Sequence, residues 1–259
     1  MPIGEYIKDR WIVKTIKNIC QVLGIEYASY SDNWLLELTK NEVTHRIIGY
    51  KFDLNNGVAA LSSEDKVVAY TILSAHNVPA IPHALARTKV ISYSQWQQNG
   101  WHDIVVKPLA GTSGHNVQLF HSESEAAEWI ESQDSDAWAV SPFVNIKREI
   151  RLIVLKNEIL LTYEKEAVTI NGLRMFNLGL GATPKNTVVS EEINALAKKA
   201  FNALDLQLGA VDIVELEDGR LMVLEVNDGV MMEHYARASK ENEDNAYAVY
   251  KAIISEVMK

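Results

Sequence analysis

Residues 208–227 read LGAVDIVELEDGRLMVLEVN, and this stretch decides the fold. Two apolar runs flank a turn at residues 217–219, which is typical of a β-hairpin. The first strand contains Asp212, and the second carries Glu225 and Asn227 near its end. Residues two apart in a strand face the same side. Antiparallel pairing about the turn can bring Asp212 close to Glu225.

Three oxygen-bearing side chains on one side of a sheet suit Mg²⁺, which binds a few carboxylates and completes its shell with water and phosphate. Asp212 and Glu225 stand between apolar neighbours. A carboxylate in such a strand is costly without a partner or a metal, so a purely structural role is disfavoured.

A second candidate site is VVKPLAGTSGHNV at residues 105–117, where Lys107 ends an apolar strand. The GTSG loop that follows consists of Gly111, Thr112, Ser113 and Gly114. Glycines let backbone N–H groups approach an anion, and the hydroxyl groups add donors. The spacing matches neither a Walker-type loop nor a nucleophile elbow. A flexible hairpin loop without a ligand remains an equal alternative.

Lys66 lies in the first turn of a helix that we predict to begin at Ser62 or Ser63. A cation there opposes the helix dipole, and a bound phosphate would remove the mismatch. Glu64 and Asp65 would offset the same charge if Lys66 were only solvated.

Three arginines form a further group, namely Arg148, Arg151 and Arg174. Guanidinium groups suit phosphate and carboxylate, although exposed salt bridges are the ordinary alternative for each. The seven histidines lack the spacing of zinc ligands.

Composition excludes other classes of protein. The 259 residues include 34 acidic and 25 basic ones, giving a formal net charge of −9, which argues against binding nucleic acid or an anionic membrane non-specifically. The one cysteine, Cys20, rules out an internal disulfide. No apolar run approaches the roughly 18 residues of a membrane helix. Charges interrupt the first twenty residues, so we expect no signal peptide and a cytoplasmic location.

The remaining pattern predicts an α+β protein. Helices are expected at residues 12–23, from Ser190, and around residues 246–257. Strands are expected within residues 26–50, at AWAVS before Pro142, and on both sides of a turn at residues 156–158. The glycine-rich stretch from residue 170 to 184 is expected to be irregular.

The order of these pieces resembles the ATP-grasp superfamily, and especially its glutamate-ligase-like members, which include the ribosomal-protein glutamate ligases. The resemblance spans about residues 49–236 and rests on SEDKVVAYTILSAHNVPA, VVKPLAGTSGHNV, REIRLIVLKNEILLTYEK, NLGLGA and the hairpin. It implies an α+β ATP-grasp fold, in which two α+β subdomains clasp ATP. The expected parts are a short N-terminal helix-plus-hairpin region at residues 1–62, a subdomain with the glycine-rich loop at 63–145, and a subdomain with the metal site at 146–259.

The resemblance also implies roles for single residues. For the nucleotide, it implies that two lysines and the glycine loop hold the phosphates, namely Lys66, Lys107, Gly111, Thr112, Ser113 and Gly114. The linker from Ser141 would bind adenine through Pro142, Phe143 and Val144. Glu149 would bind the ribose. The metal ligands for one or two Mg²⁺ ions, or Mn²⁺, are Asp212, Glu225 and Asn227. The catalytic residues, which meet the phosphoryl group or the acyl substrate, are Arg151, Arg174 and Asn177.

Two departures from the family pattern affect these roles. Pro142 stands where many relatives carry an acidic or amide residue, and it has no N–H to offer adenine. No arginine precedes Asp212, so the role of stabilising the oxyanion would fall to Arg151 or Arg174, or be absent.

The implied activity is that of an ATP-dependent carboxylate–amine ligase, which forms an amide through an acyl phosphate and releases ADP and phosphate. Its substrates would be a small-molecule or peptide carboxylate and an amine acceptor. Neither nucleic acid nor a membrane is an expected partner, and a homo-oligomer is a possible state. Two alternatives remain: a kinase-like ATP-grasp protein that phosphorylates a small acceptor, and a non-catalytic nucleotide-binding module.

Overall fold

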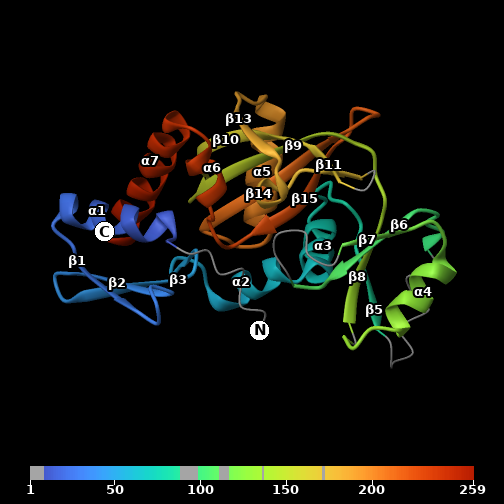
Figure 1. Cartoon of the computed structure of the whole chain (residues 1–259), viewed down its shortest axis with the longest axis horizontal. Coiled ribbons are helices and arrows are strands. Elements are labelled where there is room, and N and C mark those ends of the chain that lie inside the picture. Colours follow the sequence, from blue (N-terminus) through green and yellow to red (C-terminus); the bar gives the residue numbers. More distant parts are fainter. Residues whose placement is uncertain (1–8, 88–98, 111–116, 136, 171–172) are drawn as a thin grey trace.

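The computed structural model of the chain describes residues 9–87, 99–110, 117–135, 137–170 and 173–259. Three parts follow one another along the long axis (Figure 1): an N-terminal part, a central five-stranded sheet and a smaller four-stranded sheet. The α+β class is confirmed by this arrangement.

The N-terminal part is a helix followed by a four-stranded antiparallel meander. Helix α1 (Trp11–Leu23) ends as predicted at Gly24, whose φ of 64° favours glycine. The strands are β1 (Glu26–Tyr30), β2 (Leu35–Lys40), β3 (Val43–Ile48) and β4 (Lys51–Phe52). The predicted strands are thus confirmed, and their sheet is an extended meander.

Two consecutive helices, α2 (Gly57–Glu64) and α3 (Lys66–Ala75), follow the meander. The prediction that Ser62 or Ser63 begins a helix was wrong, because both residues lie inside α2. The Asp65 side chain instead accepts hydrogen bonds from the N–H groups of Val67 and Val68, so Asp65 caps α3. Lys66 is the first residue of that helix.

The smaller sheet has the strand order β5-β8-β6-β7 and is entirely antiparallel. Its elements are β5 (Ala84–Arg87), β6 (Ile104–Pro108), β7 (Gln118–Phe120), α4 (Glu123–Glu131) and β8 (Ala137–Pro142). The Ser122 side chain caps α4 by accepting a hydrogen bond from the N–H of Glu125. Ile104, Val106 and Trp138 form part of the core between α4 and the sheet.

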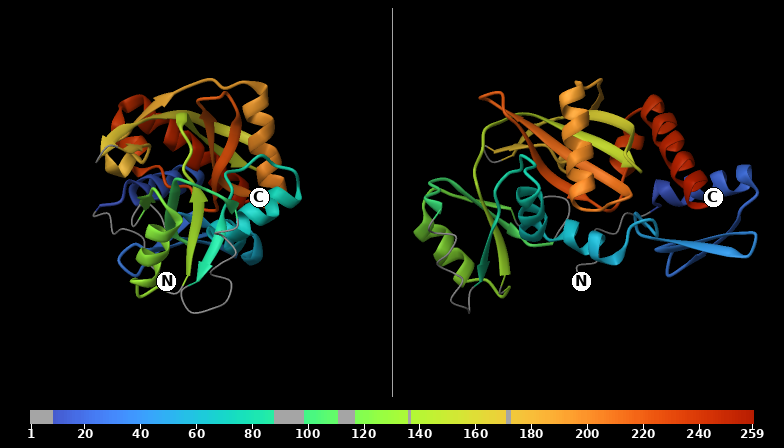
Figure 2. Two further views of the ribbon diagram at one scale, coloured as in Figure 1. Left: turned by 90° about the vertical axis from the view of Figure 1, so that its right-hand side faces the viewer. Right: turned by 180° about the vertical axis from the view of Figure 1, so that it is seen from behind.

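The central sheet has the order β13-β10-β9-β14-β15 and is also antiparallel. Its strands are β9 (Ile146–Leu155), β10 (Glu158–Glu166), β13 (Thr183–Asn186), β14 (Leu208–Leu216) and β15 (Leu221–Asn227). Helix α5 (Glu191–Ala203) covers one face, as the view from behind shows (Figure 2).

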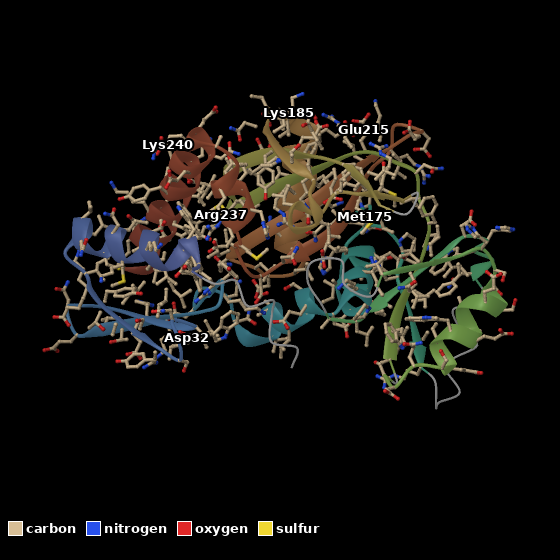
Figure 3. The ribbon with its side chains drawn as sticks, in the orientation of Figure 1. Asp32, Met175, Lys185, Glu215, Arg237 and Lys240 are labelled. Atoms are coloured by element: carbon tan, nitrogen blue, oxygen red, sulfur yellow. The ribbon has the colours of Figure 1, made fainter. Side chains whose placement is uncertain are left out.

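The stretch after β10 is more regular than predicted. It forms a hairpin of β11 (Val168–Ile170) and β12 (Leu173–Met175), then the 3-10 helix η2 (Leu178–Leu180) and strand β13. Pairing of β13 with β10 supplies the order that local sequence does not indicate. Met175 lies on the flank of the central sheet that faces the smaller sheet (Figure 3).

The chain passes between the two sheets at two places. Pro79 and Ile81 exchange backbone hydrogen bonds with Val223 of β15, and the chain then enters β5. The linker from β8 to β9 is fixed by a bond from Phe143 N to Asp103 O, at 2.8 Å. Both crossings border the space between the sheets.

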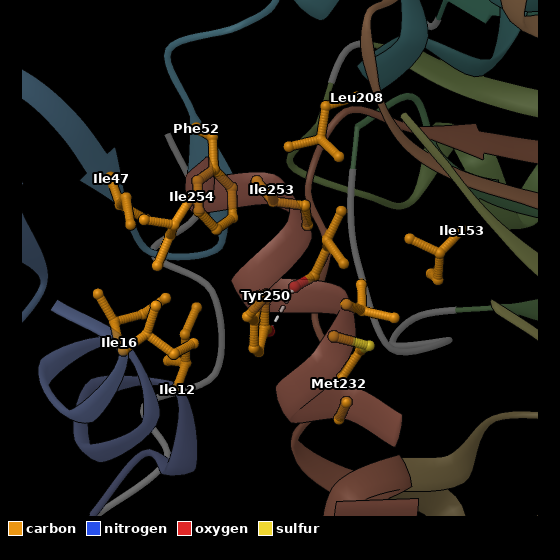
Figure 4. Close-up of a cluster of buried hydrophobic side chains, with 14 of the residues drawn as sticks. Ile12, Ile16, Ile47, Phe52, Ile153, Leu208, Met232, Tyr250, Ile253 and Ile254 are labelled. Carbon is orange, nitrogen blue, oxygen red and sulfur yellow. Dashed lines mark hydrogen bonds between the residues drawn. The ribbon is translucent and has the colours of Figure 1, made fainter. Parts of the chain in front are cut away.

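The N-terminal part shares a core with the end of the chain, α6 (Glu233–Ala238) and α7 (Lys240–Val257). Ile12 and Ile16 of α1 meet Tyr250 and Ile254 of α7 in this core (Figure 4). The buried Glu233 carboxylate accepts hydrogen bonds from the N–H groups of Trp11 (2.8 Å) and Ile12 (3.0 Å). A side chain from α6 therefore caps α1.

Helices long and apolar enough to span a membrane are not found in the ranges that the structure describes.

Candidate active site

A row of polar side chains crosses four strands of the central sheet. Tyr163 of β10 is opposite Arg151 of β9, which is opposite Asp212 of β14, which in turn is opposite Glu225 of β15. The row lies on the face away from α5, because the alternate residues Leu152, Val211 and Val226 pack against that helix. The sheet thus brings Asp212 and Glu225 together, as the sequence predicts, and adds Arg151 beside them.

Two β-bulges create this row. The β14–β15 register shifts between Asp212 and Ile213, so that Glu225 and not Leu224 lies opposite Asp212. The β9–β10 register shifts near Leu161, which places Lys165 opposite Glu149. A bulge moves every residue beyond it relative to the partner strand.

Asp212 is the most strongly held residue of the row, with a side chain that is 2% exposed. Its two oxygens bind Arg151, with Nε at 2.8 Å and Nη2 at 2.5 Å. Lys165 Nζ lies 3.0 Å from the same carboxylate and also pairs with Glu149. Burial alone raises the pKa of Asp212, but the charges of Arg151 and Lys165 outweigh it and lower the pKa to about 2.

Two lysines enter the space from the other elements. Lys66 of α3 lies 3.5 Å from Glu225. Burial is the main cause that lowers the pKa of Lys107, on β6, to about 8. The positive charge of Lys66 lowers this pKa further, whereas the negative charge of Glu225 raises it. Close cations repel each other unless an anion joins them, so this pair is suited to polyphosphate. Both lysines thus lie close to Glu225, and their predicted contact with the ATP phosphates stays a prediction.

The residues of β15 can hold a divalent cation. Glu225 is 32% exposed and lies on the same side of the strand as Asn227. The buried amide nitrogen of Asn227 has no hydrogen-bond partner among the described residues. A flip of that amide would put its oxygen there as a ligand. Asp212 is already bound by two cations, so Glu225 and Asn227 are the better-placed ligands.

Gly209 is required by the close approach of β14 to this site. A Cβ at Gly209 would lie 2.1 Å from the carbonyl oxygen of Asn227, which is closer than any real contact. Glycine therefore fixes the position of Asn227.

The other nucleotide-binding predictions are placed less directly. Gly111, Thr112, Ser113 and Gly114 lie outside the described residues. Phe143 uses its N–H on Asp103, and Pro142 has none, so Val144 is the linker residue of the predicted set whose N–H remains for adenine. Glu149 is buried beside Lys165, and burial raises its pKa. Its contact with ribose stays a prediction.

Arg174 and Asn177 are not brought to the row by direct bonds. Arg174 donates to the carbonyl groups of Ile146 (2.7 Å) and Lys147 (3.1 Å) at the start of β9. The Asn177 side chain accepts from Gly179 N at 2.8 Å and begins η2. Their catalytic roles stay predictions. Arg148 pairs with Glu215 and Glu164, away from Asp212.

Sequence reasoning missed Lys165, Tyr163 and His83. His83 is 6% exposed and lines a pocket with Lys66, Tyr70 and Glu225. Burial, Lys107 and Lys66 hold its pKa well below the usual range. Alternation along β10 indicates that Lys165 and Tyr163 share a face, but the bulge near Leu161 decides which residues of β9 they lie opposite.

The sequence places the chain in a family that agrees with this geometry. A family model described as the RimK-like ATP-grasp domain matches residues 63–250. The chain therefore belongs to the RimK-like ATP-grasp family, and the predicted resemblance to glutamate-ligase-like proteins is confirmed.

Curated relatives of the chain include ligases. The alpha-aminoadipate–LysW ligase LysX of Saccharolobus solfataricus is 28% identical over 70% of this chain and 66% of its own length. A probable alpha-L-glutamate ligase of Pectobacterium carotovorum is 27% identical over 68% of this chain and 58% of its own length. The chain spans 60–66% of the length of the first relatives it matches.

Solved structures support the fold. A D-alanine–D-alanine ligase from Bacillus anthracis, complexed with ATP, covers 99% of this chain with a TM-score of 0.61 at 15% identity, and 77% of that structure is matched. The ATP-grasp ligase PsnB, complexed with a minimal precursor, Mg and ADP, covers 76% of this chain with a TM-score of 0.56 at 14% identity, over 61% of its own chain. The predicted ATP-grasp fold is confirmed.

Proposed function

We propose that this chain is an ATP-dependent carboxylate–amine ligase that forms an amide through an acyl phosphate and releases ADP and phosphate. The observation that carries the proposal is the Arg151–Asp212–Glu225 row beside Lys66 and Lys107, in a chain whose family includes such ligases.

The first step is attack of a substrate carboxylate on the γ-phosphate of ATP. The transition state of such a transfer is loose and anionic, so positioning and positive charge provide most of the catalysis. Lys66 and Lys107 would hold the phosphates. Arg151 binds Asp212 through Nε and Nη2, which leaves Nη1 for the transferred group.

Mg²⁺, when bound, supplies further neutralisation of the phosphates. Glu225 and Asn227 would hold it, with Asp212 close by. Asp212 has a second role in this proposal, since it fixes the guanidinium of Arg151 in one orientation.

In the second step, an amine attacks the acyl carbon and phosphate leaves. The names of the relatives join glutamate or alpha-aminoadipate to LysW, and PsnB is complexed with a precursor. On this basis we propose an amino acid as the amine and a peptide or small-molecule carboxylate as its partner.

The test is turnover of ATP and Mg²⁺ with a panel of amino acids and peptides, followed by mass spectrometry of the products. The proposal expects an amide product with one ADP per bond formed, and loss of both in Glu225→Gln. A phosphorylated acceptor without amide would favour a kinase, and nucleotide binding without turnover would favour a binding module.

A further inference from the structure

The first turn of α6 forms a buried wall against the β10 end of the polar row. Tyr235 stacks on Tyr163 with ring centroids 4.5 Å apart, and Tyr163 is the direct strand neighbour of Arg151. The start of α6 therefore lies beside the row that is proposed to handle the phosphoryl group.

His234 precedes Tyr235 and stands next to η2. Its Nε2 lies 3.3 Å from the point that a Cβ on Gly179 would occupy, and the Asn177 side-chain oxygen lies 3.1 Å from the same point. A side chain at position 179 would thus crowd the imidazole. The ring is half-buried, and no described residue forms a hydrogen bond with it.

The other acids and bases around this wall already have partners. Glu233 caps α1 and pairs with Arg237, one turn further along α6 (Figure 3). Asp212 and Glu149 share Lys165. Asp228 pairs with Lys51 at 3.0 Å. His234 is the ionisable side chain at this wall that the described residues leave available.

The amide-forming step needs such a group. An amino acid reaches the site as an ammonium ion, which has no lone pair and cannot attack a carbonyl. One proton must leave the nitrogen before or during attack, and imidazole is the side chain best suited to accept it near neutral pH.

We propose that His234 is the catalytic base that takes this proton from the acceptor ammonium, an inference that rests on the proposed ligase function. The Nε2 lone pair binds one proton of the ammonium, and the nitrogen lone pair so released forms the C–N bond. The tetrahedral intermediate then collapses and breaks the C–O bond to phosphate, and the second proton that the nitrogen must lose leaves with the phosphate as the amide is released. The imidazolium returns its proton to solvent.

The test compares two amines in the wild type and in His234→Gln. Hydroxylamine is uncharged at neutral pH and needs no base, so it reports formation of the acyl phosphate as a hydroxamate. L-Glutamate is an ammonium acceptor and reports the whole reaction. Both are measured with the carboxylate that the product panel selects, and His102→Gln, at a side chain that is 87% exposed, is the matched control.

The inference expects amide formation to fall about 100-fold or more in His234→Gln, in the range for loss of a general base. Hydroxamate formation should stay within about threefold of wild type, and His102→Gln should keep both rates. An unchanged ratio of the two products would overturn the inference. If both rates persist, the leaving phosphate takes this proton in place of His234. If both rates fall together, His234 only supports the fold. His234→Asn provides a second variant with the same expectation. Absence of hydroxamate from the wild type would instead refute the ligase proposal.

Discussion

Replacing Asp212 with asparagine should damage both stability and activity, because this carboxylate is the centre of a buried ion-pair network. The change keeps the shape but leaves Arg151 and Lys165 without the charge that both now contact. Removal of one partner of a buried pair typically costs about 3–5 kcal/mol. At about 2–4 °C per kcal/mol for a protein of this size, the melting temperature should fall by about 6–20 °C.

Glu225→Gln is the matched comparison. It also removes the charge of a proposed metal ligand, but its side chain is 32% exposed and its ion pair with Lys66, which is 12% exposed, is 3.5 Å long. A partly exposed pair of that length is worth about 1 kcal/mol or less. Thermal and urea unfolding should therefore separate the two variants, while steady-state assays show both inactive. Equal stability of Asp212→Asn and Glu225→Gln would refute the assignment of Asp212 as the structural anchor of Arg151.

Three further outcomes are expected. Gly209→Ala should cost about 1–3 kcal/mol in urea unfolding and weaken Mg²⁺-dependent turnover, because the new Cβ displaces the carbonyl of Asn227; wild-type values would contradict the close approach. In the proposed site the protonated form of Lys107, whose pKa is about 8, would bind the phosphates of ATP, so the Kd for ATP should rise above pH 8. Calorimetry at pH 8.5 in two buffers should then detect proton uptake, and none would argue against the low pKa. Glu233→Gln should destabilise the protein by about 1–2 kcal/mol through loss of the charge at the start of α1, and an unchanged unfolding midpoint would contradict that role.

The sequence predicted the hairpin of the proposed metal site because its signals are local. Alternating apolar residues, a turn at residues 217–219 and acidic residues within the strands gave the neighbours Asp212 and Glu225. The cap of α5 by Ser190 and the end of α1 at Gly24 were equally local and are confirmed.

The ion-pair network of Arg151, Lys165, Glu149 and Asp212 could not be predicted from local sequence signals. Counting outward from the turn at residues 156–158 places Glu164 opposite Glu149, whereas the bulge near Leu161 places Lys165 there. A bulge is decided by packing across the sheet, so a one-residue shift is invisible to local pattern. Lys165 was missed for this reason, and Asp212 was assigned to metal alone.

The helix starts were confused because polar residues that favour caps occur close together. Asn56, Ser62, Ser63 and Asp65 are all good N-caps by type. In the structure Asn56 is the N-cap of α2 and Asp65 is the N-cap of α3, so that two helices replace the one that was predicted. Lys66 keeps its predicted place in a first turn under either arrangement.

The most direct test of the ligase proposal follows oxygen from the substrate to the phosphate. The carboxylate found in the product panel is labelled with ¹⁸O in both oxygens and turned over with ATP, Mg²⁺ and the amino acid. Formation of an acyl phosphate predicts one ¹⁸O atom in each released phosphate and one in the amide, with ADP as the nucleotide product. Unlabelled phosphate, or AMP in place of ADP, would contradict it.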